Sequence, residues 1–416
     1  MNLRVVPRSE HCLSRKDISQ EALHVLYRLN ECGHLAYIAG GGVRDLLLHR
    51  NPKDFDIVTD APPPRVRALF RNCRLIGRRF RLAHVIFNNT VVEVATFRAA
   101  EGHTESEGPI PKGASAVKTP EGLIVRDNVF GSPEEDAIRR DFTINALFYN
   151  IADYAVLDYV NGLGDLQDGL LRSIGDPRVR FVEDPARMIR ALRFAAAIGF
   201  RIEDQTWSAM SEFSPHITMV AKSRLYEELL KLFLCGQVGR VLKDLTDCGL
   251  MNVLFPEFGP WLEQSDPDQG RRKVTSMMDR VDGWIRKGQA LTPSLLLALL
   301  LGPYHEALAA PAIAEGQPAP EALREAALGH LGRLTNNFQI PRAVALETAD
   351  IIAIQPRLKE RRRRDINRLP SRTGFSEAVV YLDASLQAAN QSRELVRWWL
   401  DQVRSAPAPD SEPITE

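Results

Sequence analysis

The amino-acid sequence predicts an α+β fold in which a small mixed β-sheet is followed by an all-α region. Residues 35–97 show a β-loop-α-β pattern, which favours a mixed sheet with helices on one face. From Asp176 to the end of the chain, apolar residues recur at helical spacing. The length of 416 residues is sufficient for two or three domains.

The elements of the sheet region can be placed in order along the chain. Ser19–Gly33 carries apolar residues at helical spacing, which predicts a helix. LAYIAG at 35–40 predicts a strand that runs into a glycine turn, and VRDLLL at 43–48 predicts the start of a helix. Further strands are predicted at 54–58, 82–87 and 91–97.

Four stretches lack this periodicity. Residues 1–20 are polar and are predicted to be flexible. Residues 99–125 are polar with glycine and proline, which predicts a long loop that is either functional or disordered. The Ala/Pro-rich stretch Leu308–Ala327 predicts an insertion between helices outside the core, and the acidic tail 406–416 is predicted to be disordered.

Composition narrows the class of protein. The chain has 53 basic and 53 acidic residues, no run of eighteen apolar residues and no signal peptide, which predicts a cytoplasmic protein without a membrane span. Five scattered cysteines without C-x-x-C spacing predict reduced thiols. Two basic clusters, with five arginines within 71–81 and six basic residues within 357–364, favour binding of a polyanion, although either cluster alone is typical of a solvated helix face.

The stretch GGGVRDLLLHRNPKDFDIVTD at 40–60 predicts chemistry on phosphate. On a strand, Asp54 and Asp56 would share one face, and two like charges so close are costly without a cation between them. Mg²⁺ is the natural cation, because it binds one or two carboxylates together with substrate phosphates. The glycines before these acids let the backbone approach phosphate. The alternative is a solvated strand end with two surface acids.

A third acid, Glu93, stands in the strand sequence VVEVATFR. Alternation places Glu93 on one face with Val91 and Ala95, opposite Val92 and Val94. An acid in an apolar strand is costly unless it is paired or binds metal. Glu93 is therefore predicted either to join Asp54 and Asp56 as a third carboxylate or to form a salt bridge with Arg98.

Two later motifs carry polar residues at helical spacing. In RRDFTINAL at 139–147, a helix would join Arg140, Asp141 and Asn145 into a ridge for ribose and phosphate oxygens, or Asp141 would be an N-cap. In EDPARMIRALRF at 183–194, Asp184 and Arg187 begin a proline-started amphipathic helix. Their donors and acceptors could contact the edge of a base, and an intrahelical ion pair is the alternative.

Together with DLQDGLLRSIGDP at 165–177, these motifs stand in the order found in nucleotidyltransferases that extend RNA 3′ ends without a nucleic-acid template. Over about residues 11–260 the chain resembles that family, which contains bacterial poly(A) polymerases and tRNA CCA-adding enzymes. LIGRRFRLAHV at 75–85 is similar to the poly(A) polymerase branch, as is, more weakly, ELVRWWLDQV at 394–403. The short acidic tail and the long 99–125 loop depart from the family pattern.

The resemblance implies a domain order and a reaction. Residues 1–20 would be a flexible N-terminus, 21–170 a catalytic head, 171–260 a helical neck, 261–405 a helical RNA-binding body and tail, and 406–416 a disordered end. The implied reaction adds adenylate from ATP to RNA 3′ ends with two Mg²⁺ ions. The protein would be a cytoplasmic monomer, with RNA-decay proteins as candidate partners and mRNA decay as the outcome.

The resemblance also implies roles for individual residues. Asp54, Asp56 and Asp141 would be catalytic, with Asp54, Asp56 and Glu93 as metal ligands and Glu93 competing with Asp141 as the third carboxylate. Nucleotide contacts would come from Gly41, Gly42, Arg44, Arg140, Asn145, Asp184 and Arg187, and RNA contacts from Arg78, Arg79, Arg81, Arg361, Arg362 and Arg363. The alternatives are a CCA-adding or A-adding tRNA nucleotidyltransferase and a catalytically silent RNA-binding protein.

Overall fold

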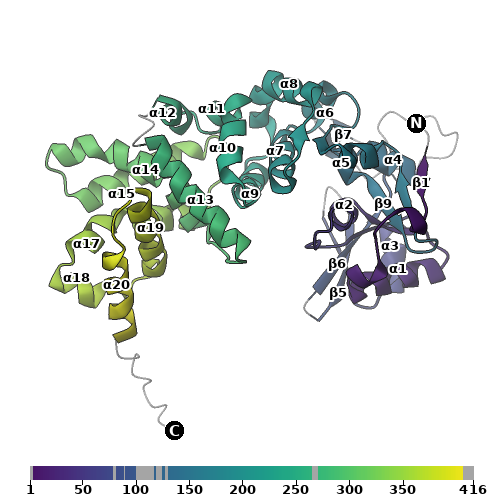
Figure 1. Cartoon of the computed structure of the whole chain (residues 1–416), viewed down its shortest axis with the longest axis horizontal. Coiled ribbons are helices and arrows are strands. Elements are labelled where there is room, and N and C mark those ends of the chain that lie inside the picture. Colours follow the sequence, from purple (N-terminus) through teal and green to yellow (C-terminus); the bar gives the residue numbers. More distant parts are fainter. Residues whose placement is uncertain are drawn as a thin grey trace, which may run out of the picture. The chain divides into compact units, whose positions relative to one another are not determined.

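The computed structural model describes residues 3–77, 81–88, 90–99, 117–118, 124–126, 130–264 and 270–405. The chain divides into two compact units, Met1–His216 and Ile217–Glu416. The first unit contains a mixed β-sheet and its surrounding helices, and the second unit is helical (Figure 1). The predicted fold class is therefore confirmed, whereas the predicted domain bounds stay a prediction.

Among the described residues, the first unit has an eight-stranded sheet in the order β1-β10-β9-β2-β3-β6-β5-β4. Strands β3 and β6 pair in parallel, and the other neighbours pair antiparallel. The sheet is mixed, as predicted. The strands are β1 (Arg4–Val6), β2 (Ala36–Ala39), β3 (Asp56–Thr59), β4 (Cys73–Ile76), β5 (Leu82–Phe87), β6 (Thr90–Thr96), β9 (Leu147–Asn150) and β10 (Val156–Asp158).

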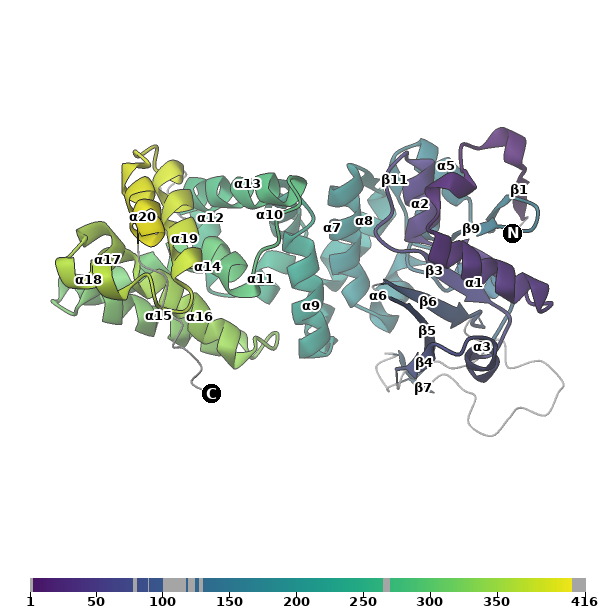
Figure 2. The same ribbon diagram turned by 90° about the horizontal axis from the view of Figure 1, so that it is seen from below.

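Helices α1 (Gln20–Glu31) and α3 (Pro63–Leu69) pack on one face of the sheet, against β3, β5 and β6 (Figure 2). On β6, Val92 and Val94 are buried beneath them, as the alternation of apolar and polar residues requires. Helix α1 begins where predicted, because the Ser19 hydroxyl accepts a hydrogen bond from the Ala22 amide at 3.2 Å. Helices are thus found on the predicted face, but helix α4 (Pro133–Ile138) also covers part of the opposite face.

The opposite face of the sheet is covered over β2 and β9. A buried cluster joins Tyr37 and Ala39 of β2 to Phe148 of β9 and to Ala137 of α4 (Pro133–Ile138). Over this half of the sheet both faces are therefore buried, whereas the half formed by β4, β5 and β6 carries half-exposed side chains on the same face.

The N-terminal segment is ordered, so the prediction of a flexible stretch at 1–20 is wrong for residues 3–20. Strand β1 pairs with β10, with Arg4 opposite Asp158. Leu13 and Ile18 are buried. The polar composition concealed these few apolar anchors, which hold the segment against the sheet.

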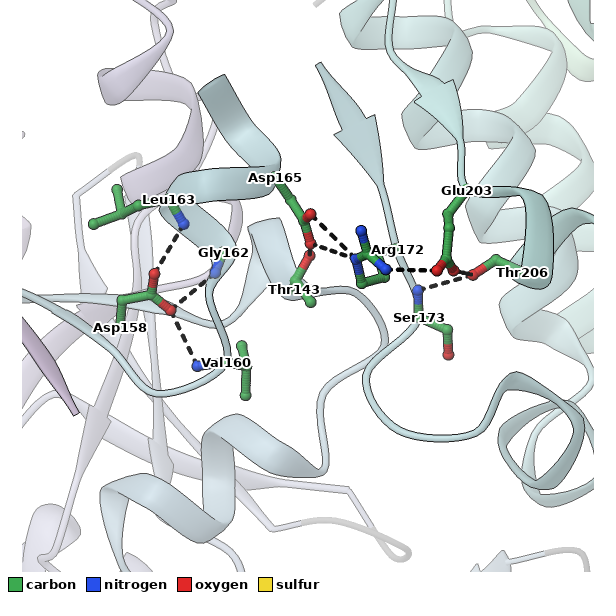
Figure 3. A network of polar contacts seen from close by, with 10 residues as sticks. All are labelled: Thr143, Asp158, Val160, Gly162, Leu163, Asp165, Arg172, Ser173, Glu203 and Thr206. Atoms are coloured by element: carbon green, nitrogen blue, oxygen red, sulfur yellow. Dashed lines mark hydrogen bonds and ion pairs between the residues drawn. The ribbon is translucent and has the colours of Figure 1, made fainter. Parts of the chain in front are cut away.

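Further helices of the first unit are α2 (Gly41–Leu47), α5 (Gly162–Gln167), α6 (Pro177–Glu183), α7 (Ala186–Ile198) and α8 (Asp204–Phe213). Two small strand pairs are also present, the antiparallel β7 (Val117–Lys118) and β8 (Ile124–Arg126) and the parallel β11 (Leu170–Leu171) and β12 (Arg201–Ile202). Buried Asp158 caps the loop before α5 by accepting hydrogen bonds from the amides of Val160, Gly162 and Leu163 (Figure 3). A carboxylate satisfied by three amides stabilises the loop in one conformation.

A second polar network explains the motif at 165–177 (Figure 3). Asp165 accepts a hydrogen bond from the Thr143 hydroxyl at 2.6 Å and from Arg172 Nε at 3.1 Å. Arg172 also donates to Glu203 at 2.5 Å, and Glu203 accepts from Thr206. This motif therefore holds the turn at Thr143 in place and does not itself contact the acids of β3 and β6.

The second unit consists of α9 (Lys222–Phe233), α10 (Val238–Asp247), α11 (Leu250–Leu254), α12 (Phe258–Gln264), α13 (Arg272–Arg286), α14 (Pro293–Ala314), α15 (Ala319–Leu334), α16 (Arg342–Ala353), α17 (Gln355–Glu360), α18 (Arg363–Arg368), α19 (Phe375–Ala388) and α20 (Glu394–Ser405). Helix α14 packs against α13, α15, α16 and α19. In the part of the chain that the structure describes, α14 is the one helix long and apolar enough to cross a membrane, and 61% of its apolar window is buried within the protein. We therefore interpret it as a core helix.

The prediction of an insertion at Leu308–Ala327 is wrong. The stretch forms the end of α14 and the start of α15, and Ala309, Leu323 and Ala327 are buried. Proline is more typical of loops than of helices, but here it is compatible with a helix. Pro318 and Pro320 lie at the N-terminus of α15, where a missing N–H group is tolerated because it has no intrahelical partner.

Candidate active site

The glycine turn between β2 and α2 is held against the 139–147 motif. Gly40 has φ +72°, and its amide donates to the carbonyl of Leu147 at 3.1 Å. A Cβ at Gly40 would lie 2.9 Å from Arg140 Nη1, so only glycine fits here without displacement. A Cβ at Gly42 would lie 3.4 Å from Phe55, and at Gly41 it would make an ordinary contact at 3.6 Å with Arg44.

Two of the predicted acids lie at the start of β3. Asp56 is the first residue of the strand and is solvent-accessible, whereas Ile57 is buried. Asp54 precedes the strand, so the prediction that the strand begins at Asp54 is wrong, and the shared face of the two carboxylates stays a prediction. The charge of Asp54 nevertheless acts on Asp56, because it contributes to the raised pKa of the Asp56 carboxyl.

Glu93 lies beside Asp56 on the neighbouring strand. Ile57 is opposite Val94 in the parallel pairing of β3 and β6, so the preceding residues, Asp56 and Glu93, are also neighbours. Glu93 is half-exposed, and its Oε1 lies 3.4 Å from His84 Nε2.

The predicted alternative partner of Glu93, Arg98, lies two residues beyond the end of β6. The backbone amide of Arg98 donates to Asp136. The contact of Glu93 with His84 therefore replaces the salt bridge that was predicted with Arg98.

The pKa of Asp56 records how these acids interact. Loss of solvation raises the pKa of the Asp56 carboxyl above its usual range, although the side chain remains accessible to water. The negative charges of Glu93 and, more weakly, Asp54 raise it further, and Arg140 opposes the rise. Three acids that repel one another at a solvent-accessible strand end are suited to a cation.

The acids fit Mg²⁺ together with a substrate. Within the described ranges, no three His, Cys, Asp or Glu side chains converge on one point as a finished metal cage. Mg²⁺ does not require such a cage, because it keeps waters and uses one or two carboxylates plus substrate phosphates. The donors are carboxylate oxygens, which this ion prefers. Asp54, Asp56 and Glu93 are therefore the residues that would hold it.

Arg44 is a buried cross-link between α2 and the 139–147 motif. Its Nη1 donates to Asn145 Oδ1 at 2.7 Å, and its Nε and Nη2 donate to Asp45 Oδ1 at 2.9 and 2.7 Å. The guanidinium also lies 5.3 Å from the centre of the Phe194 ring of α7. Arg44 is 7% exposed, so in this structure it fixes the glycine turn.

The 139–147 motif does not form the α-helix that its spacing predicted. Residues 139–141 form a bend, and Thr143–Asn145 form a short 3₁₀ turn. Asp141 and Asn145 still meet, because Asn145 Nδ2 donates to Asp141 Oδ1 at 3.2 Å. The predicted polar ridge therefore exists in a tighter backbone conformation.

Asp141 is paired with Arg190 of α7. Burial alone would raise its pKa, but the charge and hydrogen bonds of Arg190, together with Asn145 and the charge of Arg187, lower the pKa of Asp141 to about 2. Its predicted catalytic role stays untested. The geometry shows a charged carboxylate that connects the 139–147 motif to α7.

Arg140 lies between the glycine turn and the acids. It forms an ion pair with Asp136 at 2.9 Å and stacks 5.2 Å from the centre of the Phe148 ring. Its Nη1 donates to the carbonyl of Asn145 at 3.3 Å. Because its charge lowers the pKa of Asp56, Arg140 is close enough to attract phosphate that approaches the acids.

Asp184 and Arg187 lie at the junction of α6 and α7. The Asp184 carbonyl accepts the Arg187 amide at 3.0 Å. The Arg187 side chain is buried and donates to the carbonyl of Arg180 at 3.0 Å and to Glu183 at 3.3 Å. Arg187 thus forms its ion pair with Glu183. The spacing in the sequence had suggested an ion pair with Asp184 instead.

The predicted RNA contacts fall in both units. Arg78 and Arg79 lie outside the described residues, and Arg81 is exposed before β5. Near α18, Arg361 lies 5.7 Å from the Trp398 ring, Arg362 pairs with Glu360 at 2.7 Å, and Arg363 is exposed. Those described arginines are accessible to a polyanion.

Sequence reasoning missed two residues of α7, Arg190 and Phe194. The Phe194 ring lies 5.3 Å from the guanidinium groups of Arg44 and Arg190 and 4.3 Å from that of Arg193. The spacing of Arg187, Arg190 and Arg193 at three-residue intervals was the available signal, because it places them on adjacent turns of one helix face.

Three family models match the chain. They are described as "Poly A polymerase head domain" at residues 36–172, "Probable RNA and SrmB- binding site of polymerase A" at 199–262, and "Polymerase A arginine-rich C-terminus" at 315–416. The head-domain match contains the glycine turn, all three acids and the 139–147 motif.

Solved structures share the fold at low identity. A CCA-adding enzyme in its apo form II aligns with a TM-score of 0.62 and 19% identity over 99% of this chain and 89% of the other. The Thermotoga maritima CCA-adding enzyme complexed with tRNA aligns with a TM-score of 0.60 and 18% identity over 97% of this chain and 87% of the other.

Curated relatives show closer similarity. The CCA-adding enzyme of Leuconostoc mesenteroides is 37% identical over 58% of this chain and 56% of its own length. Poly(A) polymerase I of Salmonella typhi is 40% identical over 98% of this chain and 87% of its own length, and that of Escherichia coli O157:H7 has the same identity and coverage. The chain therefore belongs to the bacterial poly(A) polymerase I family.

Proposed function

We propose that this nucleotidyltransferase adds adenylate residues from ATP to RNA 3′ ends without a nucleic-acid template, and that tailing directs mRNA to decay. The observation that carries the proposal is the meeting of Asp56 and Glu93 on adjacent strands, beside a glycine turn that Arg44 links to Asn145 and that lies against Arg140. Relatives named poly(A) polymerase I at 40% identity support adenylate as the product. We further propose a cytoplasmic monomer whose candidate partners are RNA-decay proteins.

The acids would hold the metal and align the reacting groups. Asp54, Asp56 and Glu93 would bind two Mg²⁺ ions, which lower the pKa of the RNA 3′-hydroxyl and neutralise the leaving pyrophosphate. The carboxylates would hold this charge at the strand end, where the RNA 3′ oxygen would attack the α-phosphate of ATP and release pyrophosphate. Positioning and charge neutralisation account for most of the catalysis in such transfers, so no covalent enzyme intermediate is required.

The remaining residues would position ATP. Arg140 would attract the triphosphate toward Asp56, while Arg44 and Asn145 keep the glycine turn in the conformation that admits phosphate. Asp184 and Arg187 would present their polar groups to the base at the start of α7.

Incorporation of labelled ATP into oligo(A) tests the proposal. We expect Asp56→Asn to lower the rate by about 10³-fold or more, because losing a metal ligand raises the barrier by several kcal/mol. The matched control is Asp60→Asn, which removes one charge just beyond the other end of β3 and keeps an oxygen for the Leu35 amide. A near-normal rate in Asp56→Asn would exclude this acid from the reaction.

A CCA-adding activity is the second candidate, because CCA-adding enzymes are found among both the curated relatives and the structural neighbours. The two activities are separated by offering ATP or CTP with either oligo(A) or tRNA that lacks its 3′ end. Long tails made from ATP alone support the proposal. Addition that stops after a few nucleotides on tRNA, and that uses CTP, supports the alternative. A silent RNA-binding protein would incorporate neither nucleotide.

A further inference from the structure

A half-exposed surface extends over β4, β5 and β6, on the sheet face that carries Asp56 and Glu93. We call it the open sheet face, and it consists of Arg74, Ile76, Leu82, His84, Ile86 and Val91. On the other side of these strands, Val85 and Val92 are buried under α1 and α3. The open sheet face therefore differs from the part of the sheet formed by β2 and β9, where both faces are buried.

Strand register arranges this face in rows. Arg74 of β4 is opposite His84 of β5, and His84 is opposite Glu93 of β6. Because Glu93 neighbours Asp56, this polar row leads across three strands to the acids. Aliphatic pairs flank it on both sides, with Ile76 opposite Leu82 and Ile86 opposite Val91.

The aliphatic residues are unusually accessible. Ile76 and Val91 are each 48% exposed. A single exposed aliphatic side chain is ordinary, but here two lie on one face. Ile76 lies beside half-buried Leu82 on one side of the polar row, and Val91 lies beside half-buried Ile86 on the other side. Apolar pairs on both sides of a charged row suit a chain that carries both phosphates and bases.

We propose that the open sheet face binds the last nucleotides of the RNA substrate and guides the 3′ end to Asp56. Bases stack on histidine rings and arginine planes, and they gain from contact with apolar side chains. Arg74, helped by exposed Arg71 and Arg81, provides positive charge for the phosphates. An RNA end that reaches Glu93 and Asp56 along the polar row must cross this face. The inference rests on the proposed function, because it assumes that RNA is the substrate.

The test measures binding of a short fluorescent oligo(A) to the full chain in EDTA without ATP, so that it does not depend on catalysis. We expect the double variant Arg74→Ala/His84→Ala to raise the Kd about 10-fold or more, since a lost stacking contact has an effect of that order. The matched control is Arg67→Ala/His24→Ala, which removes the same side-chain types from the exposed surface of α3 and α1.

A second variant guards against misfolding. Val91→Asp places a negative charge on the open sheet face at an exposed position, so it should fold and still weaken binding by a similar factor. Thermal unfolding of each variant is measured alongside. Unchanged Kd values in both variants, or an equal loss in the control, would overturn the inference.

Photocrosslinking locates the RNA end directly. An oligo(A) with a photoreactive 3′-terminal nucleotide should attach to the peptide segment 72–92, and attachment confined to other segments would exclude the open sheet face. If the parent protein incorporates no ATP but binds and crosslinks as described, the proposed function fails and the RNA-binding face remains. If it incorporates ATP while the variants bind RNA normally, the face alone is excluded.

Discussion

Arg190 donates two hydrogen bonds to one oxygen of Asp141, with Nε at 2.9 Å and Nη2 at 2.6 Å from Oδ2. The two residues are 49 positions apart, and the pair joins the 139–147 motif to α7. The other oxygen, Oδ1, accepts from Asn145, which in turn accepts from Arg44. These polar contacts form one continuous chain from α7 to the glycine turn. Helix α7 carries Arg187, which was expected to help select the base.

Removing Arg190 should destabilise the protein, because it leaves the Asp141 charge in a site where the carboxylate is 10% exposed. We expect Arg190→Gln to lower the free energy of unfolding by about 2–3 kcal/mol, below the range for fully buried pairs because Arg190 is about one-third exposed. Urea denaturation measures this change. Arg178→Gln is the control, since its partner Glu212 is half-exposed and the pair should contribute less than about 1 kcal/mol.

Asp141 also predicts how stability depends on pH. Its pKa is lowered in the folded protein to about 2 from the ordinary 3.8, so the unfolded chain binds more protons between these values. The contribution, about 2 kcal/mol, is complete above about pH 5 and is lost as the pH falls toward about 2. In denaturation series across this window, Asp141→Asn should lose less stability than the parent protein. Parallel curves would show that Asp141 is not the titrating group.

Gly40 should tolerate substitution less well than Gly33, another glycine with positive φ. Gly40 and Gly33 have φ +72° and +80°, but a Cβ meets Arg140 at 2.9 Å in the first case and nothing within 4 Å in the second. We expect Gly33→Ala to cost about 1 kcal/mol, and Gly40→Ala to cost about 2–4 kcal/mol and to raise the KM for ATP. Equal costs in thermal unfolding would mean that Arg140 moves aside freely.

In the second unit, His305 and His330 form a buried pair with 2.9 Å between Nε2 and Nδ1. Burial lowers the pKa of both imidazoles, that of His330 to about 4, with Arg333 acting in the same direction and Glu257 against it on His330. The folded protein therefore resists protonation that the unfolded chain accepts below about pH 6.5.

The stability that this pair contributes should be complete above about pH 6.5 and should fall by about 3 kcal/mol toward pH 4. Calorimetry across this range measures the loss. The double variant His305→Gln/His330→Gln should flatten the dependence, whereas His24→Gln, at an exposed position on α1, should leave it unchanged. A steep dependence in the double variant would assign the effect to other groups.

Local sequence patterns predicted the elements better than their contacts. The alternation around Glu93 correctly gave its strand and its face, and the spacing before Gly33 gave α1. Such patterns extend over a few residues. The hydrogen bond from Arg44 to Asn145 spans 101 positions, so periodicity carried no information about it.

Other failures have local physical causes. The D-x-D argument assumed a strand from Asp54, whereas β3 begins at Asp56, because strand ends are set by pairing partners and not by alternation alone. Helical spacing in the 139–147 motif was overridden by tertiary contacts, since Asp165 binds Thr143 and Arg190 binds Asp141. The pairing of Glu93 with His84 required the register of β5, which the sequence does not reveal.

The pairing of β3 with β6 also has a consequence for assembly. Shifting β3 by one residue would turn Ile57 toward solvent and drive Asp56 into the apolar layer under α1, which is costly for a charged group. Misregistered chains are therefore disfavoured at the folding stage, before any substrate is bound. The hydrogen bonds between β3 and β6 stabilise the sheet and also place Asp56 beside Glu93. A chain that folds with the correct register has therefore also brought these two acids together.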